Sequence, residues 1–295
     1  MALTINTNIS SLVAQGNLTK ATASLNTAIE RMTTGYKINH ASDNAAGYSI
    51  ARNWETQLGS LDVAADNAAT GADMLTTLED TYTLVTSHIQ RVRDLTEQAA
   101  NGTYGSQSLK AIQSEITARL QEVDRIAANC EFNGLKMMNG SMSTISLQVG
   151  LYSDADSRID LKDELFEKGD VESLFTTYGE LANGSIEDVA NACAGLDEDG
   201  HIVNGQSTML NVIDKVINEI SSRVTTLGAA QNRIDSAIES IDVQAENITS
   251  SLSTLRDADI AEESSNYIQA QILQQAAATL LATANQTPSI ALNLL

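Results

Sequence analysis

Proline, cysteine and aromatic residues are scarce in this sequence of 295 residues. It has one proline, Pro288, and aromatic side chains make up only 4% of it. Because proline is the strongest helix breaker, long helices can run through almost the whole chain, and their contacts must rely on leucine, isoleucine, valine and alanine. The composition therefore favours a mainly α-helical fold.

The residue types of common chemical sites are few and scattered. Cys130 and Cys193 are too few for a disulfide framework and lack the spacing of a zinc site, so we expect free thiols. The three histidines, His40, His88 and His201, are isolated, and no HExxH motif is present.

The sequence also lacks a GxSxG elbow, a P-loop and a dinucleotide-binding fingerprint. We therefore expect a protein that is not an enzyme and that binds no metal and no cofactor. One alternative stays open, an acidic hydrolase that uses Asp197, Asp199 and His201.

Basic residues are outnumbered, with 17 Lys and Arg against 38 Asp and Glu and a net charge of -21. This balance excludes a nucleic-acid binder, which needs a basic face to contact phosphates. Residues 151–200 hold fourteen acidic and three basic side chains, so this part of the chain must face water. The sequence has no basic segment followed by an apolar one, so it predicts no cleavable signal peptide. It also has no run of about 18 apolar residues, so it predicts no membrane-spanning helix.

Both ends of the chain lack charge: residues 1–19 and 264–295 contain no Asp, Glu, Lys or Arg. Because chain ends are normally polar and solvated, these ends are expected to be buried against each other, against another copy, or both. The apolar side chains expected to make those contacts are Leu18, Leu25, Ile29, Met32, Ile268, Ile272 and Leu280.

The middle of the chain carries helical stripes of apolar residues. One stripe follows heptad spacing from 210 to 255 and predicts a single long helix whose packing seam includes Leu227, Ile234, Ile238 and Ile241. Matching stripes at 54–92 and 109–126 predict two more helices, separated by a turn at 101–105. Residues 144–150 and 158–161 alternate like a short strand pair. We expect an antiparallel helical bundle with a small β-hairpin.

Two polar clusters suggest either recognition or simple structural roles. Arg91 and Arg93 flank Val92 on a helix and point outward, where they either form a recognition surface or pair with Glu115 and Glu122. Residues 42–47 are good helix N-cap residues, and the polar stretches 35–47 and 255–263 are predicted hinges.

Several segments, taken together in this order and spacing, resemble bacterial flagellin over about 1–161 and 207–295. They are 5–8 (INTN), 30–35 (ERMTTG), 38–39 (IN), 43–47 (DNAAG), 98–103 (QAANGT), 131–134 (EFNG), 270–276 (AQILQQA), 284–288 (ANQTP) and the final Leu294 and Leu295. The resemblance implies three domains. Residues 1–42 and 256–295 would form a coiled coil in the filament core, 43–162 and 207–255 a helical rod with a β-hairpin, and 163–206 a short acidic surface-exposed insertion.

The same resemblance implies function. The chain would be a structural subunit of a secreted homopolymer, the flagellar filament, exported unfolded by the flagellar type III system. Its partners would be its own copies, an export chaperone, and the cap and hook-junction proteins. A vertebrate Toll-like receptor would recognise Gln90, Arg91, Arg93, Leu95 and Glu115. The short insertion predicts a thin filament. The alternative within the family is a hook-filament junction protein.

Overall fold

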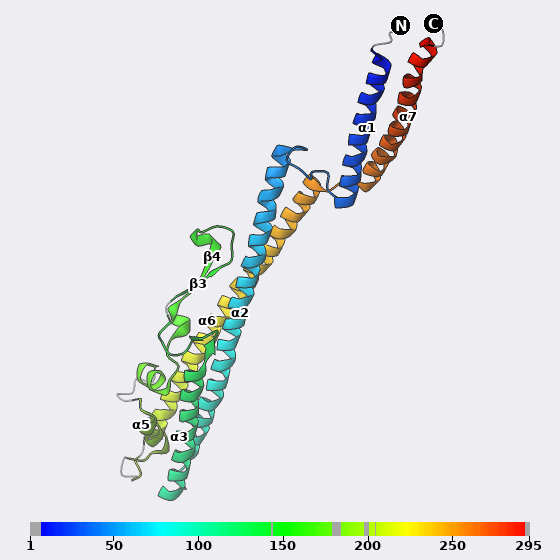
Figure 1. Cartoon of the computed structure of the whole chain (residues 1–295). Helices are drawn as coiled ribbons and strands as arrows, with labels where there is room; N and C mark the ends of the chain where they lie inside the picture. The colour runs from blue at the N-terminus through cyan, green and yellow to red at the C-terminus, as the bar shows by residue number, and fades with distance from the viewer. Residues whose placement is uncertain (1–6, 143, 179–183, 198–200, 204, 293–295) are drawn as a thin grey trace. The chain divides into compact units, whose positions relative to one another are not determined.

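The computed structural model describes residues 7–142, 144–178, 184–197, 201–203 and 205–292. The chain forms two compact units, one of residues 1–59 with 245–295 and the other of residues 60–244. The first unit thus combines the two ends of the sequence, whereas the second is one continuous stretch (Figure 1).

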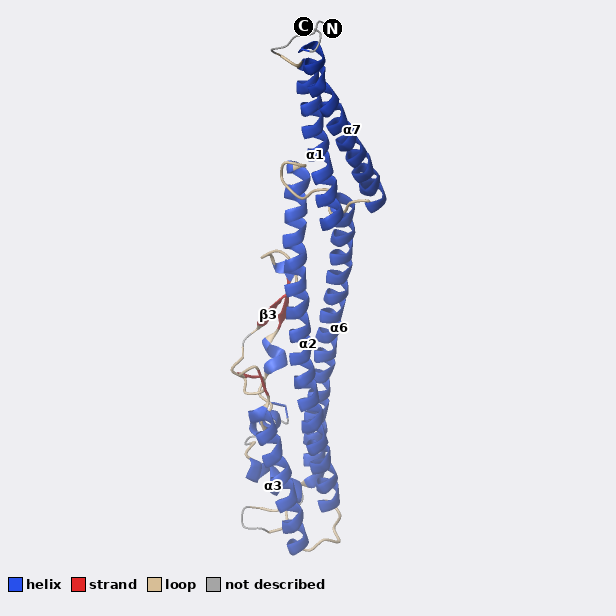
Figure 2. Cartoon of the chain, turned by 45° about the vertical axis from the view of Figure 1, so that its right-hand side comes forward, coloured by secondary structure: helices blue, strands red, loops and turns tan. Residues whose placement is uncertain are grey.

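Long helices dominate the chain, as the composition predicts (Figure 2). The α-helices are α1 (Ile9–Thr34), α2 (Ala45–Ala99), α3 (Ser106–Asn129), α4 (Val171–Ser173), α5 (Ile186–Ala194), α6 (Gln206–Arg256) and α7 (Ile260–Leu292). Short 3-10 turns cover Ala155–Ser157 and Asp163–Phe166, and a π-helical turn covers Leu174–Tyr178. The prediction of a mainly α-helical protein with packed long helices is confirmed.

Polar caps and glycines set the helix boundaries. The side chain of Asn8 accepts a hydrogen bond from the Ser11 amide at 3.1 Å and caps α1, which ends at Gly35 in a left-handed conformation. The Asn44 side chain accepts from the Gly47 amide at 2.9 Å just where α2 begins, as predicted for this cluster.

Two small antiparallel hairpins follow α3. Strands β1 (Glu131–Phe132) and β2 (Leu135–Lys136) are joined by Asn133 and Gly134, which both have positive φ, as a two-residue hairpin turn requires. Strand β3 (Ile145–Gln148) pairs with β4 (Arg158–Leu161) in the predicted region, with Leu147 opposite Ile159.

The 60–244 unit is built on α2, α3 and α6, which run alongside one another (Figure 1). Their predicted apolar stripes supply the core. Fully buried members are Leu75, Leu78, Val85, Ile89 and Val92 of α2, Ile116, Leu120 and Val123 of α3, and Ile213, Ile220, Leu227 and Ile234 of α6. Of the other predicted seam residues, Ile241 is buried and Ile238 is half-buried. The buried face of α6 also includes Met209, Val216, Arg223 and Ala230, a second set with heptad spacing.

The acidic segment 163–206 has two faces. Acidic side chains such as Glu164 and Glu187 are exposed or half-buried at the surface, as the sequence predicts. Its apolar side chains, including Phe166, Phe175 and Val189, are buried in the 60–244 unit. Helix α5 packs along α3. The segment therefore contributes to a core, which its acid-rich composition did not indicate.

Candidate functional site

The terminal helices α1 and α7 pack against each other in antiparallel directions. Near the start of α1, the Asn8 side-chain amide donates to the Ala284 carbonyl at 2.7 Å. Near its end, Arg31 Nη1 lies 3.0 Å from Glu263 Oε1. Two helices from opposite ends of the sequence thus form one pair whose register is marked by polar contacts at both ends.

Alanines form the interface of this pair. The buried side chains of α1 are Ala14, Ala21 and Ala28, spaced by heptads, and those of α7 include Ala270 and Ala277 with the same spacing. Small side chains at a heptad seam let two helices approach closely. These alanines were not among the predicted contact residues, which were larger, although the spacing of seven was visible in the sequence.

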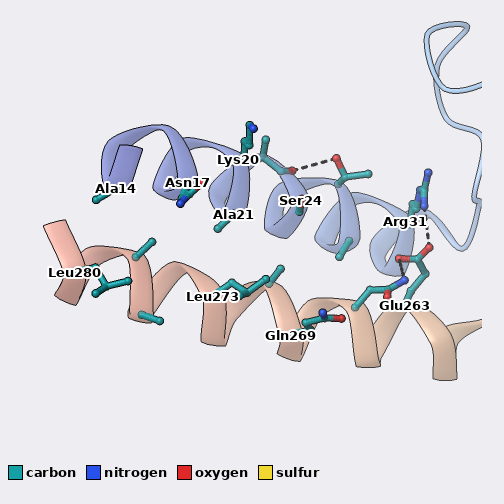
Figure 3. Close-up of a pocket in the computed structure, with 17 residues that line it drawn as sticks. Ala14, Asn17, Lys20, Ala21, Ser24, Arg31, Glu263, Gln269, Leu273 and Leu280 are labelled. Atoms are coloured by element: carbon teal, nitrogen blue, oxygen red, sulfur yellow. Dashed lines mark hydrogen bonds and ion pairs between the residues drawn. The ribbon is translucent and has the colours of Figure 1, made fainter. Parts of the chain in front are cut away.

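A groove of about 770 Å³ follows the pair. Figure 3 shows Ala14 and Ala21 of α1 facing Leu273 and Leu280 of α7 across it. Leu280 remains 61% exposed, so α1 does not cover this large apolar side chain of α7.

Large apolar side chains remain exposed on both terminal helices. They are Ile9, Leu12, Val13, Ile29, Ile260, Ile268, Ile272, Leu273 and Leu280, with Leu12 71% and Ile272 60% exposed. Among the predicted assembly residues, Ile29, Ile268, Ile272 and Leu280 belong to this set, while Leu18, Leu25 and Met32 are half-buried. Large apolar side chains left exposed on two packed helices indicate a site of interaction with another protein. We call this set of nine exposed residues the apolar terminal surface.

The two predicted hinges lie side by side, because Tyr36 and Asp257 form an antiparallel backbone bridge. The Lys37 amide donates to the Arg256 carbonyl at 2.7 Å. The Arg256 guanidinium stacks over the Tyr36 ring at 4.1 Å and pairs with Glu55. The chain thus leaves and re-enters the terminal pair through two segments bonded to each other.

Asp43 organises the first of these segments. Its carboxylate accepts hydrogen bonds from the His40 and Asn39 amides at 3.0 and 3.1 Å, and the His40 bond in particular lowers the pKa of Asp43. Beside it, His40 Nε2 lies 2.8 Å from Glu30 Oε1 of α1.

The second predicted cluster lies on α2 and α3 in the 60–244 unit. Arg91 Nη2 is 2.9 Å from Glu115 Oε1, and both side chains are partly exposed. Arg93 points instead to α6, where its Nε is 2.7 Å from Asp214 Oδ1, and this bond raises the pKa of Arg93. Gln90 is exposed, whereas Leu95 is only 1% exposed.

Glu122, the other partner predicted for the two arginines, pairs instead with Arg125 of its own helix at 2.5 Å. The structure therefore pairs Arg91 with Glu115 of α3 and Arg93 with Asp214 of α6.

Neither cysteine has the surroundings of a reactive thiol. Both are buried and free. Cys130 Sγ lies 3.5 Å from Thr81 Oγ1, and Cys193 lies near the Thr96 hydroxyl. Thr81 and Thr96 lie on one helix, separated by about 22 Å at 1.5 Å per residue, which is beyond the reach of a disulfide. Burial raises the pKa of Cys193 to about 12.

The residues of the hydrolase alternative are at the surface. His201 Nδ1 lies 3.3 Å from Asp197 Oδ2, but the histidine side chain is 77% exposed, and Asp199 is outside the described residues. Among the residues that the structure describes, no three His, Cys, Asp or Glu side chains group as metal ligands. No helix within the described ranges of residues has the length and apolar character needed to cross a membrane.

Comparisons with known proteins agree with this arrangement. The model of the bacterial flagellin N-terminal helical region matches residues 5–143, and that of the C-terminal helical region matches residues 210–295. A flagellin of Xenorhabdus nematophila is 35% identical over 312 aligned positions, and polar flagellin F of Vibrio parahaemolyticus is 32% identical over 376; each alignment covers both chains completely.

Among solved structures, one assigned to a flagellar hook-associated protein of Vibrio parahaemolyticus has a TM-score of 0.60 at 14% identity. The match covers 73% of this chain and all of that one, and it shows a shared fold. With both terminal family models matched and full-length relatives above 30% identity, the chain belongs to the bacterial flagellin family and is a structural component of the extracellular flagellar filament.

Proposed function

We propose that the chain polymerises through the apolar terminal surface of α1 and α7. The observation that carries this proposal is the set of large apolar side chains left exposed on two helices that hold almost no charge. Burying one such side chain contributes roughly 1.5–3 kcal/mol before the cost of ordering the subunit. Contacts between different surfaces on successive copies, related by a rotation that does not close, generate a helical filament.

The proposed route out of the cell is the flagellar type III system, which moves unfolded chains. Two features favour such a route: both cysteines are free, and the long helices form from local contacts and can refold after passage. In this proposal an export chaperone, a filament cap and the hook-junction proteins are partners before and during assembly.

The filament is proposed to be thin. The alignment with polar flagellin F spans 376 positions, whereas this chain has 295 residues, so that relative carries residues with no counterpart here. The segment 163–206 is short, and its described apolar side chains lie in the 60–244 unit, which leaves little material for a separate outer domain. A measured diameter much larger than that of the bare rod layer would contradict this proposal.

A vertebrate Toll-like receptor is the proposed host partner, and Arg91 and Glu115 are the proposed centre of its epitope. Their side chains are exposed enough to exchange their mutual ion pair for contacts with a receptor. Gln90 lies at the exposed edge of the same region, while Leu95 is buried beneath it and Arg93 is turned toward α6. Lateral contact between filament subunits is the proposed use of these residues to the bacterium.

A hook-filament junction protein remains the second candidate because the fold is shared with a hook-associated protein. The two functions differ in whether copies of the chain add to one another. Purified full-length protein, seeded with sheared filament fragments at neutral pH, should form long uniform filaments by electron microscopy if it is a filament subunit. Persistent monomers across salt and seed conditions would favour the junction protein.

A truncated chain tests the role of the terminal helices. Deletion of residues 264–295 should leave a folded 60–244 unit by circular dichroism and abolish polymerisation. Filaments formed by the truncated protein would overturn the proposed role of α7.

A further inference from the structure

The acid-rich segment between β4 and α6 holds an unexpected share of the core. The whole sequence has three phenylalanines, and two of them, Phe166 and Phe175, lie here and are among the largest fully buried side chains. Further buried members are Leu165, Val171, Leu174, Val189, Ala190, Cys193, Ala194 and Leu196. A segment that only decorated the surface would not place its scarce aromatic residues in the interior.

Polar anchors tie this segment to each of the three long helices. On α3, Asp124 Oδ1 accepts from the Val171 amide at 2.7 Å, and Gln113 donates to the side-chain oxygen of Asn191. On α2, the buried Thr96 hydroxyl lies near enough to the buried Cys193 thiol to lower its pKa slightly against the effect of burial. The third anchor is on α6.

That third anchor is Arg223, whose side chain is only 4% exposed. Its Nη2 lies 2.7 Å from Glu167 Oε2, and its Nη1 donates to the Lys168 carbonyl at 3.3 Å and to the Tyr82 hydroxyl at 3.4 Å. Glu219 of α6 adds a contact at 3.3 Å. The guanidinium thus bonds α2, α6 and the start of the acidic segment at one buried point, and its planar set of donors suits such a junction.

We propose that residues 165–178 and 186–196, here named the brace, hold α2, α3 and α6 together and unfold only when that bundle unfolds. The brace would then be an integral layer of the rod and not an exchangeable outer insertion. This role is independent of polymerisation, because every contact that carries it lies inside one 60–244 unit.

Hydrogen exchange of the monomeric full-length protein tests the brace directly. If it opens only with the bundle, amides of α5 and α3 should exchange with the same opening free energy under native conditions. Slow, matched exchange in the peptides that contain Val189 and Ile116 would support the proposal. Fast local exchange in α5 beside a protected α3 would overturn it.

A pair of variants provides a second test. Phe175→Leu should speed exchange in both α5 and α3 by the same factor, expected to be about tenfold for loss of part of a buried aromatic side chain. Tyr152→Ala, at an exposed tyrosine of the same unit, serves as the matched control and should leave both rates unchanged. Loosening of α5 alone in Phe175→Leu would contradict a shared cooperative unit. Failure to polymerise would bear on the proposed assembly function and not on this result.

Discussion

At the residue scale, two arginines separated by one position on α2 have different surroundings. Arg91 shares an exposed ion pair with Glu115, and Arg93 bonds Asp214 of α6. Exposed pairs of this kind add only about 0.2–1 kcal/mol to stability. Removing Arg91 therefore disturbs the surface much more than the fold, which makes it suitable for testing recognition.

We predict that Arg91→Ala lowers activation of the Toll-like flagellin receptor by about tenfold or more, because a central interface arginine is a typical hot spot. Receptor-reporter cells exposed to monomeric protein give the measurement. Arg125→Ala removes another exposed arginine pair from the same unit and should keep the activity of the unchanged chain. Equal activity of all three proteins would exclude this epitope.

Cys193 yields a pH prediction. Burial raises its folded-state pKa to about 12, above the value of about 8.5 expected in an unfolded chain. The folded protein keeps the thiol proton at pH values where the unfolded chain releases it. Stability from this group is therefore complete below about pH 8.5 and is lost as pH rises toward 12.

A thiol reagent at pH 8.5 checks this behaviour in a Cys130→Ala background. Native protein should react slowly at Cys193, and protein in denaturant should react at once. Rapid labelling of the native protein would show that α5 does not shield the thiol.

The buried Arg223 shows why single residues can escape sequence analysis. It occupies the same heptad series as Met209, Val216 and Ala230, where an apolar residue would be expected. Its partners Glu167 and Tyr82 come from distant parts of the chain, so nothing in the local sequence indicates that it is buried.

At the element scale, the long helical stripes and the short alternation at 144–150 and 158–161 predicted their elements, whereas the short helix α5 was missed. The stripes at 54–92 and 210–255 correspond to α2 and α6, because a repeat sustained over many turns reports one buried face. Helix α5 has nine residues in an acid-rich stretch, too few to establish a period. The terminal pair differed for another reason, since alanines close its interface while the larger predicted residues lie outside or at its edge.

The β3–β4 hairpin is seated on α2 through a glycine. A Cβ placed on Gly71 would collide with the Leu147 side chain, and Asn67 Nδ2 donates to the Gln148 carbonyl at 3.2 Å beside it. We predict that Gly71→Ala displaces the hairpin and lowers the unfolding free energy by about 1–3 kcal/mol, as overpacking does.

Denaturant unfolding measures this effect, with Gly228→Ala as the matched control. Gly228 also lies within a long helix of the same unit, but a Cβ there meets no atom within 4 Å. The control should gain about 0.5–1 kcal/mol from its higher helix propensity. If Gly71→Ala raised the unfolding free energy by the same amount, the Leu147 side chain would have room for a Cβ at position 71.

At the scale of the whole molecule, the two units differ in how much large apolar surface they leave exposed. The 60–244 unit buries most of its large apolar residues in a core of its own, whereas the unit of residues 1–59 and 245–295 leaves many exposed on α1 and α7. The charge-free ends made this contrast predictable from sequence. Which side chains would face another copy was not, because that depends on how closely the alanines let the helices approach.

We predict that Ile272→Asp blocks seeded polymerisation without unfolding the monomer. The side chain is 60% exposed in the single chain, so a carboxylate there is solvated until assembly would bury it. Light scattering after seeding gives the readout. Gln271→Asp, which places the same charge on an exposed neighbour, is the matched control. Assembly of Ile272→Asp at the normal rate would show that this surface is not used in polymerisation.

A helical reconstruction of the assembled filament by electron cryomicroscopy tests the central claim most directly. The account predicts that α1 and α7 line the filament core and that Ile268, Ile272 and Leu280 are buried against neighbouring copies. A filament in which these three side chains remain exposed to solvent, with contacts made only by the 60–244 unit, would contradict it.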